Sequence, residues 1–170
     1  MHTTDSERSS VVPASLSLRV AAMVYEAVLL FGVIFAVSYT VLASMNWAYP
    51  LPPIPRAVLQ ATLFAIIGVY LAFCWTRTGQ TLASKAWGLK VTRHDGRLLT
   101  PSSALARYLL AWHLWLPGIA AGAVLKLPII WTLCALTVGF LLLLTPAIFD
   151  PKGRLLHDRW TGTRVIRVPA

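Results

Sequence analysis

Long runs without charge alternate with short basic segments along this chain. Asp, Glu, Lys and Arg are missing from residues 27–55, 57–76, 108–125 and 127–149. An α-helix rises about 1.5 Å per residue, so about 20 apolar residues cross the roughly 30 Å hydrocarbon core of a bilayer. Each run reaches or approaches that length. The pattern therefore predicts four membrane-spanning helices, over about 20–45, 56–75, 104–125 and 129–149.

The segments between these helices contain residues that begin or end helices. The proline-rich segment 49–55 cannot continue a helix and predicts a stiff turn. Thr100 is a residue type that caps helices, and Pro101 suits the first helical position. Pro117, followed by glycine, predicts a kink within the third helix. A re-entrant hairpin or a long broken helix therefore remains the alternative to a full third and fourth crossing.

A small β element is predicted on the side of the basic segments. Asp95-Gly96 is a hairpin signal, and it lies between the apolar-bearing runs 89–93 and 97–99. The β-branched tail 163–168 is expected to add a third strand, since a two-stranded hairpin alone is marginal. The predicted fold class is an all-α membrane protein: a four-helix transmembrane bundle with a small cytoplasmic β-hairpin and tail-strand element.

The composition limits the chain to one membrane domain. It is 57% hydrophobic and 12% charged, whereas soluble domains are about 25% charged. We expect a disordered polar tail over 1–17 and a membrane domain over 18–167. Within that domain, the loop 76–103 and the tail from 150 to 170 are expected to be cytoplasmic.

The basic residues predict the orientation in the membrane. If both termini are cytoplasmic, thirteen of the 15 Lys and Arg residues lie inside, and only Arg56 and Lys126 lie outside. The positive-inside rule favours this arrangement, which suits an even number of spans. The sequence thus predicts a multi-pass protein of a bacterial inner (plasma) membrane. The same rule accounts for the net charge of +9, so no nucleic-acid partner is expected.

Glu26 is the only acidic residue within a predicted span. A charge at the bilayer centre costs at least about 2.5–3.5 kcal/mol, so such acids usually face a partner or a cavity. Arg19 lies seven residues earlier, nearly two turns, and therefore on the same helix face, about 10 Å away along the axis. Two interpretations of Arg19 stay open: it reaches the lipid headgroups, or it joins a polar network with Glu26.

A second polar constellation follows the fourth predicted helix and contains Asp150, His157 and Asp158. Asp158 is expected to accept hydrogen bonds from Arg19 or from backbone amides, because both would lie at the same membrane face. His113, in the third predicted helix, is a further hydrogen-bonding candidate.

Enzymatic chemistry is not expected from these residues. No serine lies in a Gly-x-Ser-x-Gly turn, which leaves a hydrolase without a nucleophile. Cys74 and Cys134 fall inside apolar runs and are read as buried apolar side chains. The sequence thus predicts no enzyme, no cofactor and no metal site.

These residues together resemble the RDD family of bacterial membrane proteins, named for one arginine and two aspartates. Arg19, Glu26 and Asp158 match the named positions, although the family name calls for aspartate where Glu26 stands. The loop motif 79–96 with Arg107 and the tail motif 149–163 also match, and the resemblance covers residues 16–167. The predicted functional network is Arg19, Glu26 and Asp158. The supporting candidates are Arg107, His113, Asp150 and His157.

Two functions are compatible with this resemblance, which implies a largely uncharacterised membrane protein. The first is ion or proton-coupled transport, with Glu26 as the intramembrane acid. The alternative is a non-catalytic scaffold or accessory protein whose basic cytoplasmic face binds a partner or anionic lipid headgroups. A homo-oligomer or a membrane-protein partner is expected in either case.

Overall fold

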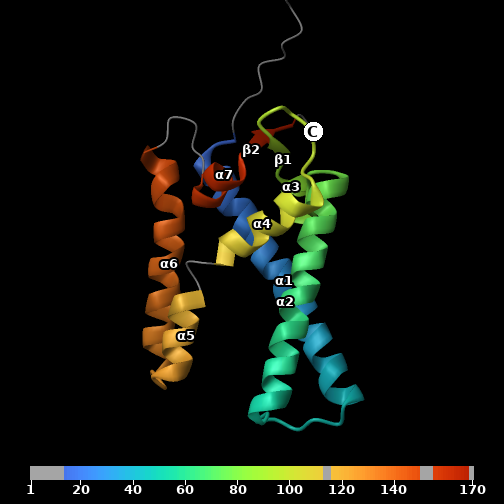
Figure 1. Ribbon diagram of the computed structural model, residues 1–170, viewed down its shortest axis with the longest axis vertical. Coiled ribbons are helices and arrows are strands. Elements are labelled where there is room, and N and C mark those ends of the chain that lie inside the picture. Colours follow the sequence, from blue (N-terminus) through green and yellow to red (C-terminus); the bar gives the residue numbers. More distant parts are fainter. Residues whose placement is uncertain (1–13, 113–115, 150–154, 169–170) are drawn as a thin grey trace, which may run out of the picture.

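The structure is a computed structural model that describes residues 14–112, 116–149 and 155–168. Helices make up most of these ranges, and two short strands pair near one end of the molecule (Figure 1). The elements in chain order are α1 (Leu16–Ser44), α2 (Pro53–Arg77), α3 (Leu82–Ala86), β1 (Leu89–Arg93), α4 (Pro101–Trp112), α5 (Leu116–Val124), α6 (Ile129–Phe149), α7 (Leu156–Thr161) and β2 (Thr163–Arg167).

Three helices in the described ranges are long and apolar enough to cross a membrane: α1, α2 and the Ile129–Pro146 part of α6. Few of their side chains are buried inside the molecule. A lipid surrounding explains why so many apolar side chains lie on the outside, so the chain is a membrane protein.

The third predicted span is divided into two helices. α4 has 12 residues and α5 has 9, so they are about 18 Å and 14 Å long, and each is too short to cross a bilayer alone. Pro117, where the sequence predicted a kink, is the second residue of α5, and α5 runs on a different course from α4 (Figure 1).

Two antiparallel helix pairs form the body of the molecule (Figure 1). One pair is α1 with α2, and the other is α5 with α6. α4 packs on α2 and on α7. The start of α1 and the ends of α2 and α6 lie at the same end as α3, α7 and the two strands (Figure 1). We call this the sheet end.

Local sequence explains where the helices begin. The Ser15 hydroxyl accepts a hydrogen bond from the Leu18 amide at 3.4 Å and caps α1. α2 begins at Pro53, which cannot donate a backbone hydrogen bond and suits a first helical position. The predicted cap of α4 is present, because the Thr100 hydroxyl accepts from the Ser103 amide at 3.3 Å.

The two strands pair antiparallel, from Leu89 opposite Arg167 to Arg93 opposite Thr163. The tail strand was therefore predicted correctly, but the expected strand over 97–99 was wrong. The Arg93 amide does donate to the Arg97 carbonyl at 2.9 Å and closes the turn. The Val91 amide, however, donates to the Gly79 carbonyl at 2.7 Å. Because Gly79 already occupies this edge of β1, a strand over 97–99 has no continuous ladder to join.

The buried core lies toward the sheet end, where α1, α2 and α4 meet the strands. Gly68 of α2 faces the ring of Tyr108 of α4, whose hydroxyl donates to the Phe64 carbonyl at 2.8 Å. A Cβ at position 68 would lie only 2.8 Å from Tyr108 Cε1. The absence of a side chain at Gly68 thus lets α4 pack closely against α2.

Candidate functional site

Asp158 is a fully buried carboxylate at the sheet end. It stands in the first turn of α7, where Oδ2 accepts a hydrogen bond from the Leu155 amide at 3.2 Å and caps the helix. A buried charge is very costly unless it is paired and hydrogen-bonded. Its position on α7 points this carboxylate toward α1 and α4, which supply the compensating cations.

Arg19, in the first turns of α1, supplies the first cation. Its Nη1 lies 3.2 Å from Asp158 Oδ2, and its Nη2 donates to the Val165 carbonyl of β2 at 3.2 Å. The side chain is 3% exposed. The contact between Arg19 and Asp158 that the sequence predicted is therefore present, and the alternative in which Arg19 reaches the lipid headgroups is not what the structure shows.

Arg107 of α4 supplies the second cation. Its Nη1 donates to Asp158 Oδ1 and, at 2.5 Å, to the Thr163 hydroxyl. The guanidinium carbon lies 5.2 Å from the ring centre of Trp75, within the range of a cation–π contact. Arg19, Arg107, Asp158 and Thr163 form what we call the Asp158 network. It ties together α1, α4, α7 and β2 through two cations and one anion.

Glu26 belongs to a separate polar group that faces α2 and α3. Its Oε2 accepts a hydrogen bond from the Thr81 hydroxyl. Thr81 also caps α3 through the Ser84 amide at 3.2 Å, and its hydroxyl lies 2.9 Å from that of Ser84. The Tyr70 hydroxyl, which accepts from the Leu82 amide at 3.4 Å, is close to the same carboxylate.

The second oxygen of the Glu26 carboxylate, Oε1, is buried and has no hydrogen-bond partner among the described residues. Glu26 is one of the residues that line a cavity of about 480 Å³, which we call the Glu26 cavity. Helices α1, α2, α4 and α6 all contribute to its wall, together with the strands. Most of its lining is apolar, and five lining side chains carry a charge or a hydroxyl: Arg19, Glu26, Thr81, Ser84 and Arg107.

The structure divides the predicted site residues into two groups. Arg19 and Asp158 meet, and Arg107, predicted only as a supporting candidate, bonds the same carboxylate. The carboxylate of Glu26 makes its hydrogen bond with Thr81 instead. His113, Asp150 and the side chain of His157 lie outside what the structure describes.

Sequence reasoning missed Thr81, Ser84 and Tyr70. The order Thr81-Leu-Ala-Ser84 is a recognisable helix start, but it does not reveal which carboxylate the cap hydroxyl meets. Tyr70 stands in an uncharged run, where an aromatic side chain reads as part of the apolar surface. The contact of Thr81 with Glu26 depends on the way α3 packs against α1, and Ser84 joins this group through its hydrogen bonds with Thr81.

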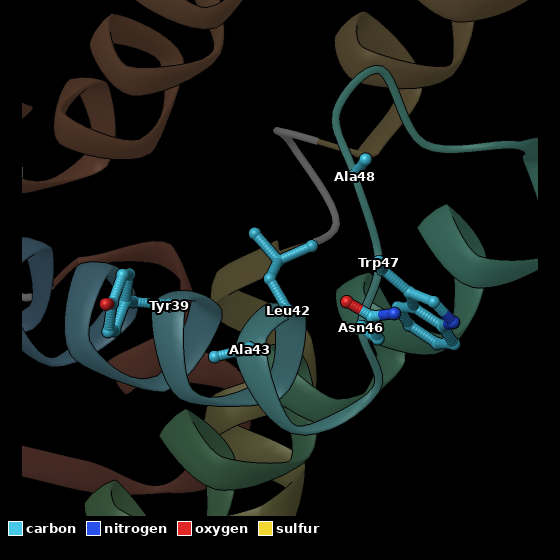
Figure 2. A pocket seen from close by; sticks show the side chains of 6 residues that line it. All are labelled: Tyr39, Leu42, Ala43, Asn46, Trp47 and Ala48. Carbon is cyan, nitrogen blue, oxygen red and sulfur yellow. The ribbon is translucent and has the colours of Figure 1, made fainter.

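A second hollow lies at the end of α1 away from the sheet end (Figure 2). Its volume is about 360 Å³, and the described residues that line it carry no charge: Tyr39, Leu42, Ala43, Asn46, Trp47 and Ala48. Asn46 and Trp47 stand where the chain leaves the helix (Figure 2). Amphipathic rings of this kind settle at a membrane interface, so we assign this hollow no chemistry.

Comparison with known proteins gives one match. The RDD family model matches residues 13–162 of the chain, a range that contains Glu26 and the three charged members of the Asp158 network and ends just before Thr163. No curated protein and no solved structure matches the chain.

Proposed function

The chain belongs to the RDD family, and we propose that it exchanges protons for monovalent cations across a membrane at the carboxylate of Glu26. The proposal rests above all on Glu26, an acidic residue within the apolar helix α1 that lines a cavity and whose carboxylate accepts a hydrogen bond from the Thr81 hydroxyl. Acids within membrane helices are costly, and they commonly mark proton or ion paths. A carboxylate can hold either a proton or a cation, and this competition is the basis of exchange.

The Asp158 network supports this role by holding the cavity in shape. Arg19 and Arg107 line the cavity and are both bonded to Asp158. The network thereby joins the first, middle and last parts of the described chain around one buried carboxylate. We propose it as the structural support of the site and not as the place where the transported cation binds.

We further propose four crossings with both termini in the cytoplasm of a bacterial cell. In this arrangement α4 and α5 together make one broken crossing. Figure 1 supports it, because the start of α1 and the ends of α2 and α6 lie at one end of the molecule. Broken helices are tolerated at membrane depth where protein or a cavity surrounds them, and α4 contributes Arg107 and Trp112 to the Glu26 cavity.

Proton flux in proteoliposomes tests the exchange role. Vesicles that contain the purified protein and a pH-sensitive dye receive a gradient of Na⁺ or K⁺, and the change of internal pH is followed. We expect wild-type protein to couple the two gradients and Glu26→Gln to lose at least about 90% of the rate, because the neutral amide does not titrate and so cannot exchange a proton for a cation. Glu26→Asp keeps the carboxylate and should retain part of the rate.

Thr137→Val is the matched control for these variants. The Thr137 hydroxyl bonds only the Leu133 carbonyl of its own helix, away from the Glu26 cavity, and its loss should leave the flux unchanged. A wild-type protein without coupled flux, or a Glu26→Gln variant with the wild-type rate, rejects the exchange role.

A scaffold or accessory role is the second candidate, and the surface of the sheet end supports it. Exposed basic side chains gather there on the turn after β1, on α7 and at the end of β2: Arg93, Arg97, Arg159 and Arg167. Such a surface attracts anionic headgroups or an acidic partner. Purification after crosslinking separates the two roles, because a stoichiometric foreign partner supports the scaffold and a homo-oligomer supports transport.

A further inference from the structure

The Glu26 cavity is larger than a bare metal ion needs. Hard cations are held by about six or more oxygen ligands at roughly 2–2.6 Å. Among the described residues that line the Glu26 cavity, the side-chain hydroxyls and the carboxylate come from three: Glu26, Thr81 and Ser84. The volume of about 480 Å³ lies within the roughly 300–1,000 Å³ of pockets that hold organic ligands. The cavity is therefore large for a metal ion and poor in oxygen.

The walls of the cavity suit an apolar body. Leu30, Leu71, Trp112 and Phe140 line it from four different helices. Burial of apolar surface contributes about 25 cal/mol per Å², and aromatic rings add a cation–π attraction for a positively charged ligand. The ligand that such walls favour has a large apolar surface and few polar groups.

The sign of the ligand's charge follows from the hydrogen bonds at the two ends of the cavity. The guanidinium hydrogen bonds of Arg19 and Arg107 go to protein acceptors, on Asp158, Thr163 and Val165. At the other end, the Glu26 carboxylate lies beside the hydroxyls of Thr81 and Tyr70, and no ion pair joins it to a cation among the described residues. Opposite charges attract more strongly where water is largely excluded. A positive group on the ligand is therefore favoured at the Glu26 end of the cavity.

We propose that the Glu26 cavity binds lipophilic organic monocations, which compete with a proton for the Glu26 carboxylate. This inference rests on the exchange role proposed above and extends its cations from Na⁺ and K⁺ to organic ions. The positive centre of the cation lies at the Glu26 end of the cavity, and its apolar groups lie against the aromatic and aliphatic walls. An anionic amphiphile, drawn instead to Arg19 and Arg107, is the competing occupant.

Two ions of equal size and opposite charge distinguish these occupants. Tetraphenylphosphonium and tetraphenylborate have nearly the same shape and apolar surface, so a difference in their binding reports charge alone. Binding to the detergent-purified protein is measured by equilibrium dialysis against protein-free micelles. We expect saturable binding of tetraphenylphosphonium, at least tenfold weaker in Glu26→Gln and unchanged in Thr137→Val. Tetraphenylborate should show no binding that depends on Glu26.

A second measurement needs no variant and therefore does not depend on the folding of Glu26→Gln. Dicyclohexylcarbodiimide, an apolar reagent, adds to protonated carboxyl groups, and mass spectrometry locates the adduct. We expect labelling of Glu26 in wild-type protein that tetraphenylphosphonium slows at least fivefold and that tetraphenylborate does not slow. A Glu26 that resists labelling, or that is labelled equally fast with the cation present, overturns the proposal.

The outcomes also separate this inference from the exchange role. Flux driven by Na⁺ or K⁺ that depends on Glu26, together with no binding of tetraphenylphosphonium, rejects the organic-cation site and leaves exchange standing. Binding of tetraphenylphosphonium that depends on Glu26, without any coupled flux, keeps the site and rejects exchange. Tighter binding of tetraphenylborate than of tetraphenylphosphonium by the wild-type protein would show that the cavity prefers anions, which overturns the proposed positive charge of the ligand.

Discussion

At the scale of residues, Asp158 is expected to contribute more to the free energy of unfolding than either arginine that bonds it. Loss of Asp158 leaves the guanidinium groups of Arg19 and Arg107 without their shared anion, whereas loss of Arg19 leaves Asp158 still bonded to Arg107. Breaking a buried ion pair by removal of one partner costs about 3–5 kcal/mol. The two kinds of loss should therefore differ in size.

A double-mutant cycle in detergent measures this network. We expect Asp158→Ala and Arg19→Ala each to lower the free energy of unfolding by up to about 3–5 kcal/mol, with the larger loss for Asp158→Ala. The double variant should lose less than the sum of the two, because the residues share one interaction. Equal losses that simply add would show that the residues act independently. Arg19→Ala combined with Thr137→Val, which is remote from the network, is the additive control.

At this scale the sequence predicted the contact between Arg19 and Asp158 correctly, because the order of the helices across the membrane brings these residues to the same end. Arg19 and Asp158 meet because the start of α1 and the segment after α6 share one end of the molecule, and the charge pattern predicts that arrangement. The role of Arg107 depends on the angle at which α4 leaves the sheet end. That angle is set by packing of Arg107 and Tyr108 against Trp75 and Phe64 of α2, and a local pattern of residues does not reveal it.

At the scale of elements, the contact between α2 and α4 depends on one glycine. Gly68→Ala should lower the free energy of unfolding in detergent by about 1–3 kcal/mol, the usual cost of overpacking, because the new Cβ meets the Tyr108 ring at 2.8 Å. Thermal unfolding monitored by circular dichroism gives the measurement.

Gly32→Ala is the matched control for that variant. Gly32 also lies inside a long apolar helix, but a Cβ there would meet nothing within 4 Å. Alanine has the better helix propensity, so this variant should be neutral or slightly stabilising. Equal effects of the two variants would show that the Tyr108 contact does not hold α4 in place.

The errors of sequence reasoning at this scale have local causes. The Asp95-Gly96 signal identified the turn correctly. Residues 97–99 do not form a strand beside β1, because the Gly79 carbonyl accepts a hydrogen bond from the Val91 amide at that edge. Within the uncharged run 108–125, hydropathy does not register that α5 runs in another direction than α4. The sequence indicated that change of direction through the kink predicted at Pro117.

At the scale of the whole molecule, orientation is the main prediction that the charge pattern makes. Reporter fusions near Asp95 and after Lys152 should give cytoplasmic signals, and a fusion near Pro53 should give an external one. The positive-inside rule is the reason, since only Arg56 and Lys126 lie on the side predicted to be external. An external signal after Lys152 would reject four crossings in favour of three.

The order in which the Asp158 network is synthesised has a consequence for assembly in the cell. Arg19 leaves the ribosome first, Arg107 follows, and Asp158 comes 139 residues after Arg19. Until translation reaches Asp158, a nascent chain holds two cations at the membrane without their anion, and α7 and β2 are not yet made. Closure of the sheet end must therefore wait until almost the whole described chain has been made, and a chain cut short before Asp158 lacks the anion that both arginines share.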